Sequence, residues 1–537
     1  MQRSAIRSLR AAAGRIAMLV LLVACSHAST ASSGPPHVLR IAYAGDPNSL
    51  VPLVAIDADL TGMDTLFCQT LIGLDAQNEP VPILVTRIPS RSNGDISPDG
   101  KLVTYHLRHG VHFADGVEFT SADVAFTYRA VLDPRNHAVI VGPYRAIESL
   151  QTPDPYTVTI KLRRPWNAAV YELLAEGDFI FGILPKHAFS DTKVLGTPWE
   201  NAPFGTGPFR VKEWARGDKI VFVPNPYYAP KPKLQQIVLQ IYPNLNSNFV
   251  ALQSGAVDIG NLTAENLAEA STIDRIKVLR IPDNGTNLLY LNTKIEPTND
   301  IRVRRAIANA LDYTQLANAW KREYDSATGF LPPPIVRWKG AAIPAYGHDP
   351  GAASRELEAA GWRLENGTRT KNGVPMTGLI AVSSENPTMV RIATVIQAQL
   401  AALGMHFELK SEPVRVWFSP QGLLRSGKAA LMVEAWVGGM DPEQSLNLQC
   451  SQAVVGDSNH SFYCTKPFEA LVSDQATTAD DARRWRDFDG MERLVHQDVP
   501  VIPLYYDRLF RGVSTRVTGY ALNILWIPVN VENWDAR

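Results

Sequence analysis

LIAVSSENPTMVRIATVIQAQLAALGMHFEL, residues 379–409, holds a complete strand–helix–strand pattern. The apolar residues in its middle recur at helical spacing, at Met389, Ile392, Ala393, Ile396, Leu400 and Leu403. A short apolar run, Leu379–Val382, precedes them, and an alternating segment beginning at Met405 follows. Gly404 is the residue type that commonly ends a helix. The stretch therefore predicts a β-α-β crossover and an α/β domain.

A second α/β signal lies near residue 40. Val38–Tyr43 is an apolar run typical of a buried strand, and Gly45-Asp46-Pro47 breaks it. The apolar segment that follows predicts a helix over Asp59–Leu74. Strand followed by helix places this part of the chain in the same class.

The segment after residue 100 has a different pattern. Val103, Tyr105 and Leu107 alternate with polar residues, which predicts an antiparallel unit. Thr120 and Asp123 have the spacing of a capping box, so we expect a helix to begin there and to end before Asp133-Pro134.

A further helix is predicted after Asp300, and three arginines lie outside its apolar stripe. The stripe consists of Val303, Ile307, Ala310 and Leu311. The arginines, which we expect on a solvated face, are Arg302, Arg304 and Arg305.

The composition excludes several classes of protein. Of 537 residues, 45% are hydrophobic and 20% are charged, as in a folded globular protein. The 52 basic and 53 acidic residues nearly cancel, so no overall positive field attracts nucleic acid. We therefore expect no nucleic-acid partner.

The N-terminus has the features of an export signal. Four arginines and no acidic residue precede the apolar run Ile16–Ala24. This run is shorter than the about 20 residues that a membrane span needs. Residues 1–24 are therefore predicted to be a signal peptide, and residues 25–37 a flexible tether.

Leu22-Val23-Ala24-Cys25 resembles the cleavage box of bacterial lipoproteins, in which the Cys becomes the lipidated N-terminus. The resemblance implies a lipid anchor at Cys25 and a location in the periplasm or on the extracytoplasmic face of a membrane. The alternative is an ordinary cut after a small residue such as Ala28 or Ala31.

No motif supports an enzyme. The chain has no Gly-x-Ser-x-Gly elbow, no His-Glu-x-x-His and no phosphate-binding loop. Gly205-Thr206-Gly207 lacks the third Gly of a dinucleotide fingerprint. His106, His109 and His112 have no nearby Cys or paired carboxylate. We expect no catalytic residue, no metal and no cofactor.

Ordered blocks along the chain resemble the family 5 extracellular solute-binding proteins, the oligopeptide and dipeptide receptors of bacterial ABC importers. The blocks are GDPNSLVP (45–52), LRHGVHFADGVEFTSADVAFTY (107–128), FGTGPFRVKEWARGDKIVFVPNPYY (204–228), LQSGAVDIG (252–260), DIRVRRAIANALD (300–312) and AAGW (359–362). Each block is weak alone. Their number and order make the resemblance specific over nearly the whole mature chain.

The resemblance implies an α/β, two-lobed periplasmic-binding-protein-like fold of type II, with an extra α+β domain inserted in the first lobe. The implied divisions are 38–78, 197–285 and 500–537 for lobe I, 79–196 for the inserted domain and 286–499 for lobe II. We expect the lobes to be joined near Asn287–Asn292 and Val501–Tyr505.

The implied function is an extracytoplasmic receptor that binds a peptide or peptide-like solute between its lobes. It would deliver the solute to permease subunits and their ATPase, as a monomer. A sensor subunit that presents its ligand to a chemoreceptor or kinase is an alternative, and a secreted hydrolase is a weaker one.

The resemblance also implies site residues around the strand Leu431–Trp436. Trp417 and Trp436 match ligand-contacting tryptophans of the family, with packing in the core as the alternative for Trp417. Gly439 stands where peptide-binding relatives have an amine-binding Asp. The expected ligand-binding residues are Trp417, Glu434, Ala435, Trp436, Val437 and Gly439. Strand alternation predicts that Glu434 shares a face with Trp436, where it would favour a cationic ligand group or pair with a neighbouring Arg or Lys.

Four further residues are assigned, three in the same region and one near the start of the chain. Cys450 and Cys464 resemble the disulfide-closed loop of dipeptide-binding members, which implies a bridge. Asp441 is interpreted mainly as a turn-capping carboxylate. Cys68, in the predicted helix, is expected to be a buried free thiol.

Overall fold

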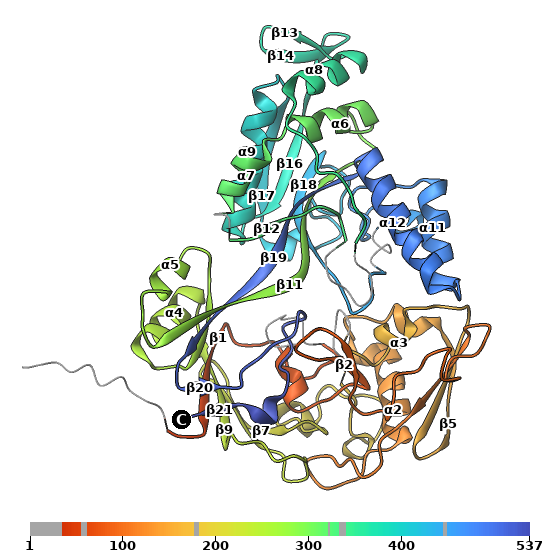
Figure 1. Ribbon diagram of the computed structural model, residues 1–537, viewed down its shortest axis with the longest axis vertical. Coiled ribbons are helices and arrows are strands. Elements are labelled where there is room, and N and C mark those ends of the chain that lie inside the picture. The colour runs from red at the N-terminus through yellow and green to blue at the C-terminus, as the bar shows by residue number, and fades with distance from the viewer. Residues whose placement is uncertain (1–34, 55–61, 177–181, 321–322, 332–339, 444–447) are drawn as a thin grey trace, which may run out of the picture.

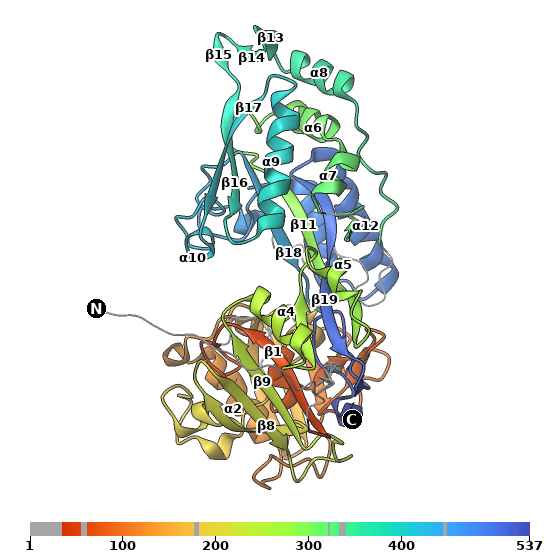
Figure 2. The same cartoon turned by 90° about the vertical axis from the view of Figure 1, so that its left-hand side faces the viewer.

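The computed structural model describes residues 35–54, 62–176, 182–320, 323–331, 340–443 and 448–537. The predicted signal peptide, the lipidation site Cys25 and most of the tether lie outside these residues. The described chain forms two bodies, joined by two long strands that cross between them (Figures 1 and 2). Within the described residues, no helix is long and apolar enough to cross a membrane.

One sheet of eleven strands runs through both bodies in the order β17-β16-β18-β11-β19-β10-β1-β9-β8-β7, with β12 beside β19. We call the body that holds β1 and β7–β10 lobe I, and the body that holds β16–β18 lobe II. The strands are β1 Val38–Ala44, β7 Phe209–Ala215, β8 Lys219–Pro224, β9 Gln236–Tyr242, β10 Ile259–Leu262, β11 Ile276–Leu291, β12 Asp325–Ser326, β16 Thr377–Ser383, β17 His406–Glu412, β18 Leu431–Val437 and β19 Val501–Ser514.

Lobe II contains the predicted crossover. β16 and β17 are parallel and α9, Pro387–Ala401, connects them. The helix buries Met389, Ile392, Ala393, Ile396 and Leu400 against the sheet, so the predicted strand–helix–strand unit is confirmed. Further elements of lobe II are α6 Ile301–Ala310, α7 Tyr313–Ala319, α8 Pro350–Ala359, β13 Arg363–Glu365, β14 Thr368–Lys371, β15 Val374–Pro375, α10 Val414–Trp417, α11 Lys466–Thr477 and α12 Asp481–Asp498.

Lobe I combines a mixed sheet with an appended unit. β1 lies parallel to both β9 and β10, and α4, Leu245–Ser254, packs beside them. We call the antiparallel sheet β4-β6-β5 with α2 and α3 the inserted unit; its elements are β4 Leu102–His106, β5 Ile147–Asp154, β6 Thr157–Leu162, α2 Ser121–Leu132 and α3 Ala169–Glu172. Thr120 and Asp123 form the predicted capping box of α2. Smaller elements are β2 Ile72–Leu74, β3 Pro80–Pro82, α5 Leu267–Ala270, β20 Val517–Thr518 and β21 Asp535–Ala536.

Of the predicted helix over Asp59–Leu74, the described part is helical only up to Leu66, and the prediction is wrong beyond it. A short 3-10 turn, Asp64–Leu66, is followed by the strand β2, which pairs with β3. Cys68 is nevertheless a buried free thiol, as expected. The backbone here passes close to lobe I glycines, since a Cβ on Gly205 would lie 2.2 Å from the carbonyl oxygen of Phe67.

The two crossing strands are β11 and β19. Residues Ile276–Pro282 pair with the lobe I half of β19, and the register shifts between Pro282 and Thr286. Beyond the shift, Thr286–Leu291 also pairs with β18 in lobe II. The register shifts again between Asn287 and Leu288, inside the first of the two expected stretches, Asn287–Asn292 and Val501–Tyr505. Both stretches contribute side chains to the core of lobe II.

Two other predictions concern lobe II. Cys450 and Cys464 form the expected disulfide, with a sequence separation of 14. Arg304, expected on a solvated face, is buried, and its guanidinium donates to the backbone carbonyls of Thr298, Asn299 and Asp498.

Candidate functional site

Five of the six predicted site residues lie in β18 or just after it, and the sixth, Trp417, lies in α10. β18 is antiparallel to β11, and Trp436 lies directly opposite Thr286. Trp436 packs against the same core as Met432, whereas Val433 and Ala435 contact the core on the other face. The predicted alternation along this strand is confirmed.

Glu434 and Trp417 bind each other within lobe II. The Glu434 carboxylate accepts the indole N–H of Trp417 and the backbone N–H of Ala435. Trp417, in α10, is fully buried. Burial raises the pKa of Glu434 to about 7, while the hydrogen bonds from Trp417 and Ala435 act in the opposite direction. Neither an Arg nor a Lys is needed to explain the position of this carboxyl group.

Trp436 and Thr286 carry buried polar atoms without a hydrogen-bond partner among the described residues. These atoms are the indole Nε1 of Trp436 and the hydroxyl oxygen of Thr286. The two side chains are cross-strand neighbours, and Thr286 is fully buried. An unsatisfied buried polar group costs about 1–3 kcal/mol. This pair is therefore a place at the junction where a polar partner would be stabilising.

The chain after Trp436 is fixed by backbone contacts. Val437 is 53% exposed. The N–H of Gly438 donates to the carbonyl of Asn284 at 2.7 Å, and the side-chain amide of Asn284 donates to the carbonyl of Gly439 at 2.8 Å. Gly439 thus offers backbone groups and no charge at the position where the family resemblance implies an amine-binding Asp.

The segment Met440–Asp441, which follows β18, contacts both lobes. Met440 is buried in the core of lobe I, although β18 before it belongs to lobe II. Asp441 is buried and accepts two hydrogen bonds from the guanidinium of Arg484, at 2.6 and 2.8 Å. It also accepts the backbone N–H of Glu443. The predicted turn-capping role of Asp441 is confirmed, and the ion pair adds to it.

Two carboxyl groups lie at the irregular part of the crossing strands. Burial raises the pKa of Asp283 well above its ordinary value, and the negative charge of Asp507 raises it further. Burial also raises the pKa of Asp507, whose carboxylate accepts the side-chain amide of Asn287 at 3.2 Å. Burial and like charge both favour the protonated form of this pair.

The three closely spaced histidines do not converge. His106 contacts Asp95, His109 stacks on Tyr156, and His112 contacts a backbone carbonyl. In the part of the chain that the structure describes, no group of three or more His, Cys, Asp or Glu side chains could hold a metal ion.

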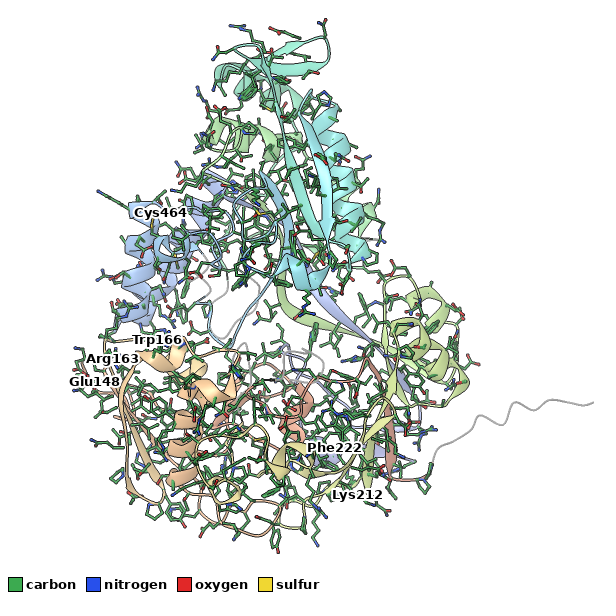
Figure 3. The ribbon with its side chains drawn as sticks, turned by 180° about the vertical axis from the view of Figure 1, so that it is seen from behind. Glu148, Arg163, Trp166, Lys212, Phe222 and Cys464 are labelled. Atoms are coloured by element: carbon green, nitrogen blue, oxygen red, sulfur yellow. A yellow bond between two sulfur atoms is a disulfide. The ribbon has the colours of Figure 1, made fainter. Side chains whose placement is uncertain are left out.

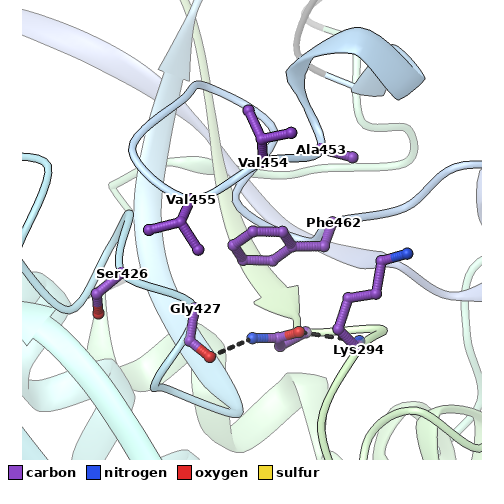
Figure 4. Close-up of a pocket in the computed structure, with 8 residues that line it drawn as sticks. Lys294, Ser426, Gly427, Ala453, Val454, Val455 and Phe462 are labelled. Atoms are coloured by element: carbon purple, nitrogen blue, oxygen red, sulfur yellow. Dashed lines mark hydrogen bonds between the residues drawn. The ribbon is translucent and has the colours of Figure 1, made fainter.

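A pocket of about 230 Å³ lies elsewhere in lobe II, beside the disulfide loop (Figure 4). Its lining residues are Asn292, Lys294, Ser426, Gly427, Ala453, Val454, Val455 and Phe462. Asn292 follows β11 at the end opposite the register shift and donates to the carbonyl of Gly427 at 3.1 Å. None of the predicted ligand-binding residues lines this pocket.

Comparison with known proteins identifies the family. The model described as "Bacterial extracellular solute-binding proteins, family 5 Middle" matches residues 79–457. The chain belongs to the family 5 bacterial extracellular solute-binding proteins. The oligopeptide-binding protein AppA of Bacillus subtilis is 24% identical over 541 residues, with 96% of each chain covered. Probable di/tripeptide-binding protein 5 of Pseudomonas aeruginosa is 29% identical over 465 residues, which cover 82% of this chain and 85% of the relative.

Solved structures share the fold of this solute-binding protein. NikA from Brucella suis, in complex with Fe(III)-EDTA, has a TM-score of 0.81 at 20% identity, covering 94% of this chain and 100% of that chain. AppA from Bacillus subtilis, in complex with a nonapeptide, has a TM-score of 0.76 at 22% identity, covering 93% and 99%. The predicted two-lobed α/β fold is confirmed.

Sequence reasoning missed the residues that connect the lobes away from the crossing strands. Trp166 and Asn167 follow a Pro in a loop of the inserted unit and contact lobe II. The sequence offers only an aromatic residue beside a polar one in a loop. That pattern does not indicate which part of the chain the two residues contact. Arg484 was also missed, because its place in a helix rich in charge hides its burial.

Proposed function

We propose that this solute-binding protein is the extracytoplasmic receptor of an ABC importer and binds a peptide or peptide-like solute between its lobes without changing it. The observation that carries the proposal is the family match over residues 79–457, on a chain whose two lobes are joined by two crossing strands. Relatives named for oligopeptides and for di- and tripeptides support the ligand class. Two lobes joined in this way can close on a solute, and a permease can then recognise the closed form.

We assign solute contact to the end of β18. The unpartnered indole N–H of Trp436 can donate to a solute carbonyl, and its ring can cover an apolar part. Val437 and Gly439 extend this contact, whereas Glu434, Trp417 and Ala435 hold the strand end from within lobe II. A solute ammonium finds no acid at residue 439, which favours an N-blocked or modified peptide over a free dipeptide.

We also propose the cellular form of the protein. Residues 1–24 are removed, the tether 25–37 starts at a lipidated Cys25, and the protein works as a monomer at the extracytoplasmic face. Lobe I is assigned residues 38–78, 197–285 and 500–537, the inserted domain 79–196 and lobe II 286–499. Two observations depart from this division: Met440 is buried in the lobe I core, and Val501–Tyr505 packs in the cores of lobe II.

The test is mass spectrometry of solute released by denaturing natively purified protein. We expect a peptide or peptide-like molecule. Incubation of purified protein with that molecule should leave it intact, because no catalytic group is assigned. Cleaved products would contradict the receptor assignment, and release of a non-peptide solute would contradict the ligand class alone.

A further inference from the structure

The end of α11 in lobe II is bound by a residue of lobe I. The last four carbonyl groups of a helix have no partner within the helix. Asn167, from the inserted unit, donates its backbone N–H to the carbonyl of Ala476 at 2.9 Å. Its side-chain amide donates to the carbonyls of Gln475 at 2.9 Å and Thr478 at 2.7 Å. One asparagine of lobe I thus supplies three donors to this helix end.

Trp166 contacts the same group of lobe II residues. Its indole N–H donates to the carboxylate of Glu443 at 3.1 Å. Glu443 is buried and lies 3.9 Å from the guanidinium of Arg484, which also donates to the carbonyl of Gln475 at 3.2 Å. Trp166 and Asn167 therefore contact one connected polar cluster of lobe II, made of Glu443, Arg484 and the carbonyl of Gln475. Figure 3 shows Trp166 at the edge of lobe I, beneath the paired helices of lobe II.

These contacts lie away from the crossing strands. Trp166 and Asn167 stand between β6 and α3, and their partners lie on α11 and just after Met440. The accepting backbone carbonyls can be hydrated when the lobes part, so the contact can open and re-form. Because such a contact exists only while the lobes are together, it favours arrangements in which they are.

We propose that Trp166 and Asn167 form an interlobe clasp, through which the inserted unit holds the closed arrangement by binding the C-terminus of α11 and Glu443. This gives the inserted unit a role in closure. The proposal rests on the proposed function, because holding the lobes together matters to a receptor that closes on its solute.

The test compares the processed, exported protein, freed of small molecules, with the double variant Trp166→Phe/Asn167→Ala. Small-angle scattering should give a larger radius of gyration for the variant. Hydrogen exchange at the backbone N–H of residue 167, which donates to the carbonyl of Ala476, should become at least tenfold faster in the variant. Both changes follow from the loss of one indole donor and two side-chain amide donors.

Matched controls carry the same chemical changes elsewhere in lobe I. Trp199→Phe removes an indole N–H that donates to the carbonyl of Phe204, and Asn93→Ala removes an amide that donates to the carbonyl of Ile88. Neither control should change the radius of gyration. If the double variant matches the wild type in both measurements, the clasp is wrong. All samples are free of solute, so this result is independent of whether the ligand assignment holds.

Discussion

At the scale of single residues, burial sets the charge state of the carboxyl groups at the lobe junction. Glu434 ordinarily has a pKa of 4.5, and burial raises it to about 7. When a group binds its proton more tightly in the folded state, the free energy of unfolding falls as the pH rises from the group's pKa in the unfolded state to its pKa in the folded state. Ionised Glu434 therefore destabilises the fold above pH 7 and has little effect at pH 5.

The expected result for Glu434→Gln is higher stability at pH 8. The amide oxygen can still accept the indole N–H of Trp417, and the cost of a buried charge disappears. From the two pKa values, the gain in the free energy of unfolding should approach about 3 kcal/mol at pH 8 and be much smaller at pH 5. Urea unfolding at both pH values measures it. The control Glu365→Gln, exposed in β13, should change little; equal gains for Glu434→Gln at both pH values would contradict the assignment.

Residue identity alone gave a wrong environment for Arg304. Three arginines outside an apolar stripe indicate a solvated face, yet Arg304 donates to three backbone carbonyls and is buried. One of these carbonyls, that of Asp498, ends α12 from a distant part of the sequence. A charge that caps a distant helix cannot be distinguished from a solvated charge by local spacing.

At the scale of elements, helices and strands were predicted correctly where apolar residues recur with a clear helical or strand period. Helix α9 was predictable because its buried residues, from Met389 to Leu400, are all apolar and recur at helical spacing, whereas the positions between them are exposed or half-buried. The segment ending at Leu74 is apolar and buried on all sides, so period could not distinguish helix from strand. The close approach of Gly205 to the backbone of Phe67 is a tertiary constraint that local sequence does not contain.

The disulfide loop carries a prediction about stability. Closing a loop of about 15 residues stabilises by about 3 kcal/mol in the chain-entropy model. The double variant Cys450→Ser/Cys464→Ser should lose about that much free energy of unfolding in a urea titration. A reducing agent should lower the stability of the wild type and leave that of the double variant unchanged. An equal effect of reductant on the variant would show that the loss of stability does not come from breaking the Cys450–Cys464 bridge.

At the scale of the whole molecule, the sequence predicted the lobes but not how they meet. The family resemblance indicated two lobes and the disulfide, and the strand alternation predicted that Trp436 shares a face with Met432. The contacts of Asn167 are made to backbone carbonyls of lobe II, and such acceptors leave no trace in side-chain pattern. The placement of Trp417 and Glu434 within one buried pair likewise depended on α10 folding against β18.

Membrane attachment is a prediction at the same scale. If Cys25 is lipidated, Cys25→Ala should release a soluble protein or leave an uncleaved precursor. Fractionation of cells followed by mass spectrometry of the N-terminus measures this, with Cys68→Ala as the control that should stay attached. Unchanged membrane retention of Cys25→Ala would show that the anchor lies elsewhere or that cleavage follows Ala28 or Ala31.

Solute binding at the lobe junction is tested most directly by thermal unfolding with a library of free, N-blocked and modified di- to oligopeptides. A ligand at 100 times its dissociation constant adds about 2.7 kcal/mol to the free energy of unfolding. We predict that at least one peptide class raises the melting temperature, and that Trp436→Ala weakens its binding at least tenfold, about 1.4 kcal/mol. A library in which no peptide shifts the melting temperature, while a non-peptide solute does, would contradict the account.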